Sequence, residues 1–237
     1  MMPFFCFFGG KWRAAPHYPA PVHPVIVEPF AGAAGYSTRY PDRQVRLYDA
    51  DPLSVGVWDY LIRVSGEEVM RLPAAVSHVD EVKACQEAKW LIGFWLNKGA
   101  ASPCKTPSRW MRDGLRPGSY WGKKIRARIA SQVGMVKHWK VWNKSFSDIR
   151  YSRDACWFVD PPYQVAGAGY RYRDVDYAAL GRWCQGRRGQ VMVCENAGAT
   201  WLPFAPFRSI KGSPGASRSG RSEEVLWVNR LPDRVQP

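Results

Sequence analysis

The stretch of sequence that decides the fold is VIVEPFAGAAGYSTRYPDRQVRLYD, which occupies residues 25–49. The apolar run at 25–30 predicts a short buried strand, a glycine turn ends it, and residues 37–40 open a helix. Residues 45–50 alternate into a second strand that closes on Asp49. Strand, glycine turn, helix, strand and acid together make the first half of a doubly wound α/β sheet.

The rest of the chain continues this pattern with a helical interruption. Apolar spacing and turn residues predict, in chain order, helices at 53–64, 82–96, 123–142 and 177–185 and strands at 156–160, 191–196, 207–211 and 223–229. Proline, glycine, serine and basic residues predict an irregular loop at 98–122 and a hairpin loop at 212–222. The predicted fold is therefore a mostly parallel α/β sheet with a mainly helical insertion.

The string Asp160-Pro161-Pro162-Tyr163 follows the apolar residues CWFV. Two successive prolines donate no ladder hydrogen bonds, so the strand has to end there. The Asp160 carboxylate and the Pro161 carbonyl are thereby placed at the carboxyl edge of the sheet, where open α/β sheets bind ligands. Two neighbouring acceptors suit an exocyclic amine, which has two hydrogens to donate, and Tyr163 offers a flat face for a base. The string predicts a nucleobase site.

The charge of the chain is unevenly distributed. Lys and Arg number 34 against 20 acidic residues, a net charge of +14, and residues 98–150 (the basic segment) hold 13 basic and 2 acidic residues. Aromatic residues are interleaved with these cations: Trp110, Tyr120, Trp121, Trp139 and Trp142. Such a segment is typical of a protein that binds a polyanion, although a solvated helical face is the alternative. The expected DNA-binding residues are Lys123, Lys124, Arg126 and Arg128.

Composition argues against several other classes of protein. With 46% hydrophobic and 23% charged residues the chain is expected to be globular, and it has no apolar run long enough for a membrane span. The N-terminal run MMPFFCFF is short and has no basic region before it, so we expect no signal peptide and a cytoplasmic protein. Six scattered cysteines without a CxxC pair, and four unpaired histidines, predict neither disulfides nor a metal site.

These strings together resemble the DNA adenine methyltransferases. The similarity is to the Dam-like arrangement, in which the cofactor motifs precede the target-recognition region and a DPPY motif follows it. Besides DPPY, it rests on Glu28-Pro29-Phe30-Ala31-Gly32 and on Gly9-Gly10-Lys11. The resemblance implies the Rossmann-like fold of S-adenosylmethionine-dependent methyltransferases. Residues 1–60 and 151–237 would form the catalytic domain, and residues 61–150 a helical, basic target-recognition region.

The resemblance also implies roles for individual residues. The catalytic set would be Asp160, Pro161, Pro162 and Tyr163. The residues around S-adenosylmethionine would be Phe7, Gly10, Lys11, Glu28, Pro29, Phe30, Gly32, Asp49 and Asp160. Phe7 replaces the usual tryptophan, and Ala34 replaces the family's second glycine. On physical grounds Gly32 permits close backbone approach, Asp49 can accept hydrogen bonds from both ribose hydroxyls, and Asp51 is expected to be an exposed turn acid.

The expected activity is methylation of the 6-amino group of adenine in double-stranded DNA, with the base flipped out of the helix. Methylation of RNA adenine or of DNA cytosine is the nearest alternative, and cytosine is disfavoured because those enzymes usually have serine in place of Asp160. A nucleic-acid-binding module without activity is a second alternative, and a nicotinamide oxidoreductase a third. The sequence leaves open the recognition site, the oligomeric state, and whether the enzyme protects phage or host DNA or accompanies a restriction enzyme.

Overall fold

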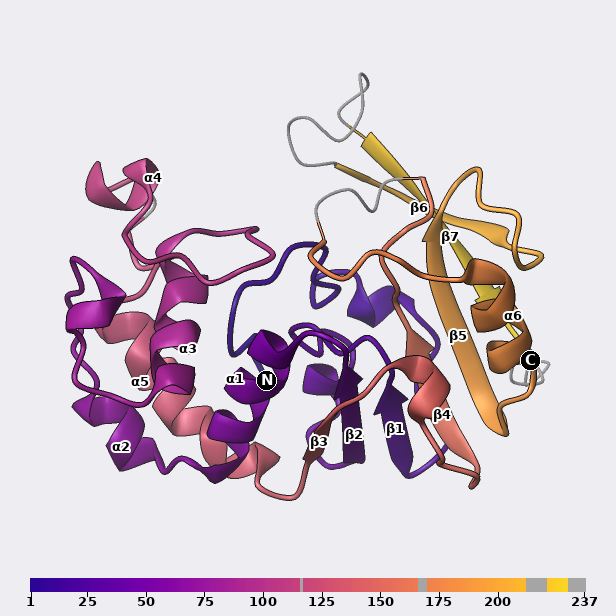
Figure 1. Cartoon of the computed structure of the whole chain (residues 1–237), viewed down its shortest axis with the longest axis horizontal. Helices are drawn as coiled ribbons and strands as arrows, with labels where there is room; N and C mark the ends of the chain where they lie inside the picture. Colours follow the sequence, from indigo (N-terminus) through magenta and orange to yellow (C-terminus); the bar gives the residue numbers. More distant parts are fainter. Residues whose placement is uncertain (116, 166–169, 212–220, 230–237) are drawn as a thin grey trace, which may run out of the picture.

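The structure is a computed structural model that describes residues 1–115, 117–165, 170–211 and 221–229. Within these ranges a seven-stranded sheet has the order β3-β2-β1-β4-β5-β7-β6 (Figure 1). The strands are β1 (Val25–Glu28), β2 (Gln44–Asp49), β3 (Lys140–Asn143), β4 (Ala155–Val159), β5 (Gly189–Asn196), β6 (Ala205–Lys211) and β7 (Arg221–Val228). Strands β1 to β5 are parallel, whereas β7 pairs antiparallel with β5 and β6.

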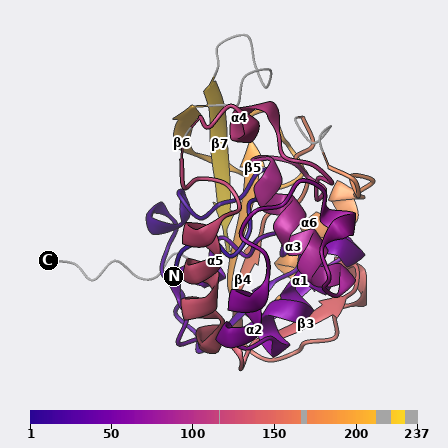
Figure 2. The same cartoon turned by 90° about the vertical axis from the view of Figure 1, so that its left-hand side faces the viewer.

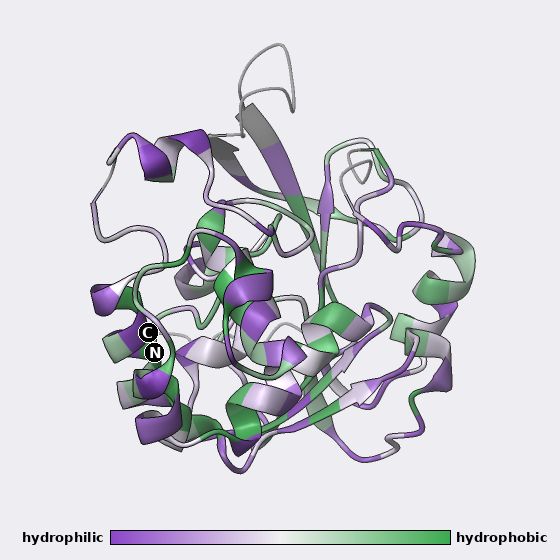
Figure 3. Ribbon diagram, turned by 60° about the vertical axis from the view of Figure 1, so that its left-hand side comes forward, coloured by the Kyte–Doolittle hydropathy of each residue, from purple (hydrophilic) through white to green (hydrophobic). Residues whose placement is uncertain are grey.

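Helices flank the sheet and extend beyond the β3 edge. They are α1 (Pro52–Arg63), α2 (Gly66–Arg71), α3 (Gln86–Leu96), α4 (Arg109–Arg112), α5 (Lys123–Gln132) and α6 (Tyr177–Gln185). Figure 2 shows α1, α2, α3 and α5 gathered into one group, with α4 above them. Hydrophilic and hydrophobic residues both occur along α5 (Figure 3), and its apolar residues Ile125 and Ile129, four positions apart, are the buried ones.

The central strands are buried on both faces. Ile26 and Leu47 belong to one apolar cluster with α1, α3 and α5, whereas their neighbours Val27 and Tyr48 belong to a second cluster beneath α6. Alternate residues of a strand point to opposite faces, so a sheet covered on both sides requires nearly continuous apolar runs. This explains why β4 is an unbroken apolar stretch and why β1 is apolar up to Glu28.

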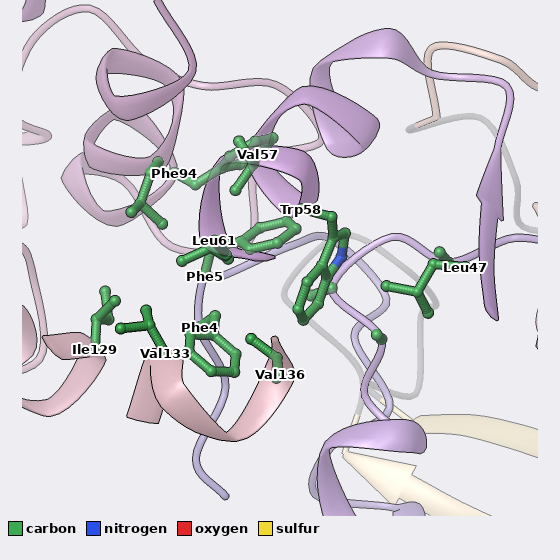
Figure 4. Close-up of a cluster of buried hydrophobic side chains, with 14 of the residues drawn as sticks. Phe4, Phe5, Leu47, Val57, Trp58, Leu61, Phe94, Ile129, Val133 and Val136 are labelled. Atoms are coloured by element: carbon green, nitrogen blue, oxygen red, sulfur yellow. The ribbon is translucent and has the colours of Figure 1, made fainter. Parts of the chain in front are cut away.

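The N-terminal apolar run enters the larger cluster. Phe4 and Phe5 are buried between α1, α3 and α5 and pack edge-on against Trp58, at 5.6 and 5.7 Å between ring centroids (Figure 4). The indole nitrogen of Trp58 in turn donates to the carbonyl of Gly32 at 2.8 Å. The apolar core therefore reaches directly to the glycine turn that follows β1.

Several predicted elements differ from the structure. The helix expected over 123–142 ends at Gln132, a 3-10 turn covers Val133–Val136, and residues 140–143 form β3 instead. The apolar stripe of that helix is buried as expected, but Lys140–Asn143 leave the helix and pair with β2, which adds a strand at this edge of the sheet. The segment 61–150 thus supplies a strand as well as helices.

Two short helices were not expected, and one expected helix is reduced. Helix α2 begins with a capping box between Ser65 and Glu68, and α4 lies inside the stretch predicted to be irregular. The helix predicted to open at 37–40 is a 3-10 turn at Ser37–Arg39. The terminal hairpin is present as β6 and β7, while residues 212–220 of its predicted loop lie outside the described ranges.

Candidate functional site

A cavity of about 460 Å³ opens at the carboxyl ends of β1, β2 and β4. From β1 the chain proceeds through β2 to β3 on one side, and β4 and β5 lie on the other, so β1 and β4 flank the point where the strand order reverses. Ligands of open α/β sheets bind in the crevice at this point, and the volume falls within the range of small-molecule sites. The cavity is therefore the candidate functional site.

The glycine turn after β1 forms one wall of the cavity. Gly32 has a positive φ of 43°, its amide donates to Asp49 Oδ2 at 2.8 Å, and a Cβ at this position would come within 3.1 Å of the Phe7 ring. Ala34, in place of the second glycine, has a φ of 47° and is the one non-glycine residue with a positive φ among the described residues. The backbone at Ala34 thus has a conformation that glycine favours, and the turn survives the substitution.

The two acids at the end of β2 both accept hydrogen bonds from backbone amides, and one of them differs from expectation. Asp49 uses both oxygens on backbone amides, accepting from Gly32 at 2.8 Å and from Asp51 at 2.9 Å. Burial raises the pKa of Asp49 to about 6. Asp51 was expected to be exposed, but it is 4% exposed, caps α1 through the amide of Leu53, and lines the cavity. A carboxylate at a helix start satisfies amides that would otherwise lack partners, and this accounts for its burial.

Lys11 and Asp160 meet at the polar end of the cavity. The ammonium of Lys11 lies 2.9 Å from Asp160 Oδ1, and it donates to the carbonyl of Gly9 at 3.0 Å. Burial by itself lowers the pKa of Lys11, but Asp160 and other nearby negative charges outweigh it and the pKa lies above the ordinary value. Burial raises the pKa of Asp160, and Lys11 opposes that shift. The GGK and DPPY strings, distant in sequence, are thus in contact.

Glu28 is a further buried acid of the site. It is 2% exposed, lines the cavity, and accepts a hydrogen bond from the amide of Ser37 at 2.8 Å. Burial raises the pKa of Glu28 to about 8, so at neutral pH this carboxyl group is protonated in most molecules. Pro29 is buried but is not among the cavity-lining residues, whereas Phe30 lines the cavity together with Phe146, at 5.8 Å between ring centroids.

The DPPY string ends β4 as predicted, and only part of it faces the cavity. Asp160 and Pro162 line the cavity, whereas Pro161 and Tyr163 are not among the residues that line it. The carbonyl of Pro162 accepts from the Tyr177 hydroxyl of α6 at 2.8 Å, which fixes the turn. Tyr163 directs its hydroxyl toward Glu224, at 3.4 Å, and stacking of a base on its ring stays a prediction.

Sequence reasoning missed several residues of this site. Phe146 follows β3, and it was overlooked because that strand was assigned to a helix. Tyr170 lies over Gly9, where a Cβ would come within 2.0 Å of the tyrosine hydroxyl. Glu195 of β5 accepts from the amide of Gln164 at 3.1 Å and so holds the segment after DPPY. An acid within an apolar strand was the available signal for Glu195.

The charge of the cavity is opposite to that of the whole chain. Among the described residues its lining contains the acids Glu28, Asp49, Asp51, Asp160 and Asp174 and the bases Lys11, Arg171 and Arg173. With Glu28 largely protonated at neutral pH, four of the five acids still face three bases, and this small negative excess in a chain with a net charge of +14 favours a ligand with a positively charged group.

The four predicted DNA-binding residues lie on α5, and none of them is among the described residues that line the cavity. Lys123 and Lys124 are exposed. Arg126 donates to the carbonyl of Leu72, and Arg128 donates to that of Pro3 at 3.1 Å. The two arginines are half-buried and join the helix to other segments. Their availability to DNA is accordingly reduced.

The aromatic residues of the basic segment also divide into two groups. Trp121 and Trp139 belong to the core, and Tyr120 and Trp142 are half-buried. Trp110 of α4 is 58% exposed. Trp121 precedes α5 and Trp139 precedes β3, and both are buried in the apolar cluster, so they are not available to stack on a nucleic acid.

No protein-family model matches the chain, and no curated protein matches it in sequence. In the part of the chain that the structure describes, no helix is long and apolar enough to cross a membrane. The same residues contain no group of three or more His, Cys, Asp or Glu placed to hold a metal ion.

Proposed function

We propose that this protein transfers a methyl group from S-adenosylmethionine to the 6-amino group of adenine in double-stranded DNA. The observation that carries the proposal is the position of Asp160, which follows β4 directly and lines the same cavity as Gly32 of the glycine turn and Asp49. A rigid carboxylate acceptor there suits an exocyclic amine, and the net charge of +14 suits a polyanion.

The lining of the cavity fits S-adenosylmethionine. This compound supplies a methyl group on a positively charged sulfur, and the excess of buried acids is favourable for that charge. Asp49 lines the cavity and would accept from the ribose hydroxyls with the lone pairs that its two amide hydrogen bonds leave free, and Phe30 and Phe146 would provide an apolar end for the adenine ring. Glu28, partly protonated, can donate as well as accept a hydrogen bond at the polar end.

The residues of this chain would act by positioning and by electrostatics. Asp160 accepts a hydrogen bond from the target amine and holds its nitrogen in line with the transferred methyl group. As the nitrogen–methyl bond formed, the sulfur–methyl bond of S-adenosylmethionine would break and leave a neutral thioether; the amine would then gain the positive charge, which the buried carboxylate would stabilise. The amine proton then leaves through Asp160 toward solvent, so a strong general base is not required.

Two observations weigh against the alternatives from other classes. A nicotinamide oxidoreductase of the dinucleotide-binding type has a parallel sheet of order 3-2-1-4-5-6, whereas this sheet ends in the antiparallel pair β7 and β6. A module without activity was suggested by the loss of glycine at Ala34, but Ala34 has a positive φ and leaves the turn intact. Methylation of RNA adenine would use the same site, so an experiment with both substrates has to distinguish it from methylation of DNA.

The proposal is tested by incubating the protein with duplex DNA, single-stranded DNA or RNA and with S-adenosylmethionine labelled in its methyl group. Digestion to nucleosides should place the label on the 6-amino group of adenine, from duplex DNA above the other substrates. Asp160→Asn should lose activity by at least about 100-fold, because an amide cannot stabilise the developing positive charge. Label on cytosine, preference for RNA, or full activity of Asp160→Asn would each overturn the proposal.

A further inference from the structure

Glu224 is a buried acid that reaches the candidate site from the C-terminal strand. It belongs to β7, opposite Asn196 of β5 and Arg208 of β6, and it is 5% exposed. Its neighbour Glu223 is exposed. Acids are seldom buried on an apolar strand unless their charge has a specific partner. The groups that contact the Glu224 carboxylate therefore indicate why it is buried.

Both carboxylate oxygens of Glu224 have neighbours that can donate. The Tyr18 hydroxyl donates to Oε2 at 3.2 Å, and the Tyr163 hydroxyl donates to Oε1 at 3.4 Å. The ammonium of Lys11 lies 3.7 Å from the same Oε1 and 4.8 Å from the centre of the Tyr163 ring. Glu224 thus contacts the GGK lysine and the DPPY tyrosine together.

Lys11 stands between two carboxylates, Asp160 and Glu224. Its ion pair with Asp160 Oδ1 is 2.9 Å long, but this oxygen has no donor with hydrogen-bond geometry among the described residues. Two buried acids around one ammonium repel each other, and each raises the energy of the other's charged form. In both acids, burial raises the pKa and Lys11 lowers it. The position of the ammonium therefore reflects a balance between the two.

We propose that Glu224 is a positioning residue for Asp160. It draws the Lys11 ammonium partly away from Asp160 and fixes the Tyr163 side chain, so that the Asp160 carboxylate keeps accepting capacity for the target amine. This inference rests on the methyl transfer proposed above. Without the charge of Glu224, Lys11 would pair with Asp160 alone and make it a weaker acceptor.

Other titratable groups surround the pair and have to be held constant in any test. They face Asp160 and Glu224 from the N-terminal segment, β1, β5 and the segment after β4, and they are Tyr18, Glu28, Tyr163, Tyr170, Cys194 and Glu195. Arg208 of β6 is the neighbouring cation. Glu224→Gln changes none of these side chains, and Glu223→Gln makes the same chemical change one residue away, on the exposed side.

The first measurement does not depend on activity. The protein is labelled with carbon-13 at aspartate carboxyls, and the Asp160 signal is assigned by its loss in Asp160→Asn. Removal of a neighbouring negative charge should lower the pKa of Asp160 in Glu224→Gln, while Glu223→Gln should match the wild type. An Asp160 pKa that is unchanged or raised in Glu224→Gln would overturn the inference, whether or not the protein is a methyltransferase.

The second measurement uses turnover. Glu224→Gln should reduce kcat for DNA methylation by about 10- to 100-fold and move the acid limb of the pH profile of kcat to lower pH. The dissociation constant of S-adenosylmethionine should change by less than about threefold. A loss of cofactor binding in step with kcat would assign Glu224 to the fold alone and overturn the inference. Absence of methyl transfer in the wild type would instead refute the proposed function and leave the carboxyl titration to decide.

A second variant covers the case in which Glu224→Gln does not fold. Tyr18→Phe keeps the ring, which stacks on Phe207 at 4.9 Å, and removes only the hydroxyl that donates to Glu224 Oε2. Loss of this donor makes the charged form of Glu224 less stable, so Lys11 should shift toward Asp160. The Asp160 pKa and kcat should change in the same directions as in Glu224→Gln, by smaller amounts. No change in either quantity would overturn the inference.

Discussion

The cavity and helix α5 use their charged residues in different ways. The cavity acids Asp49 and Asp160 are bound by backbone amides and by Lys11, within a chain of net positive charge. On α5 the cations separate into exposed lysines and half-buried arginines that bind carbonyls of other segments. The comparison shows that the position of a charged residue at a strand end predicts its place in the site. Membership in a basic segment does not predict whether a cation is exposed or bound to the protein itself.

The largest effect is expected at Glu28, where burial of a charge should make stability depend on pH. Burial raises the pKa of Glu28 to about 8, from 4.5, so the folded protein keeps a proton that the unfolded chain releases. The stability from this proton is fully present below about pH 4.5 and is lost as the pH rises through about 8. Relative to wild type, Glu28→Gln should become more stable by on the order of a few kcal/mol between pH 5 and pH 9.

Urea unfolding at pH 5, 7 and 9 measures this difference. Glu67→Gln is the matched control, because its side chain is 88% exposed and carries the same change. Other buried acids with raised pKa, such as Glu195, contribute equally to both proteins. If the stability curves of Glu28→Gln and wild type run parallel over this pH range, the buried carboxyl is not responsible.

The next effect concerns Asp49 and the cofactor. Asp49→Ala should raise the dissociation constant of S-adenosylmethionine by roughly 10- to 150-fold, the value of one lost charge-assisted hydrogen bond of about 1.5 to 3 kcal/mol. The same change frees the amide of Gly32 and loosens the turn. Asp49→Asn can still accept one amide hydrogen bond, so its effect should be smaller. Calorimetry that finds equal constants for wild type and Asp49→Ala would exclude Asp49 from the cofactor site.

Asp160 and Asp49 also show how much of the candidate site can be predicted from the sequence. Asp160 could be placed at the sheet edge because two prolines have to end a strand, and Asp49 because parallel strands end at a common edge. Both inferences depend on local geometry alone. The strand order, which puts the cavity between β1 and β4, comes only from the structure.

Other features of the fold and the site depend on tertiary contacts, which cannot be predicted from the local sequence. Strand β3 has only four residues, and it was assigned to a helix because the preceding stripe through Val136 is helical in its spacing. Glu224 meets Lys11 from the opposite end of the chain, through the pairing of β5 with β7. Tyr163 was expected to face a base, and only the tertiary contact with Glu224 reveals where its hydroxyl points.

A smaller effect separates the two kinds of cation on α5. Arg128 donates to the Pro3 carbonyl and lies 5.0 Å from the Trp95 ring, so Arg128→Met should destabilise the fold by about 1.5 to 3 kcal/mol. Lys124→Met removes the same charge from an exposed position and should change stability by less than about 0.5 kcal/mol. Urea unfolding of both variants provides the comparison, and equal effects would mean that the arginine contacts contribute nothing.

The last and smallest effect concerns DNA binding by the exposed lysines. If Lys123 and Lys124 each neutralise one phosphate, the double variant Lys123→Ala/Lys124→Ala should reduce the slope of log affinity against log salt by up to about 1.8, at about 0.9 per phosphate. Cofactor affinity and stability should stay unchanged, because neither lysine lines the cavity. Lys83→Ala, an exposed lysine outside the basic segment, is the control and should preserve the slope. Equal slopes in the double variant and wild type would show that α5 is a solvated face. The DNA would then have to contact another part of the basic segment, for which the exposed Trp110 of α4 is the next residue to replace.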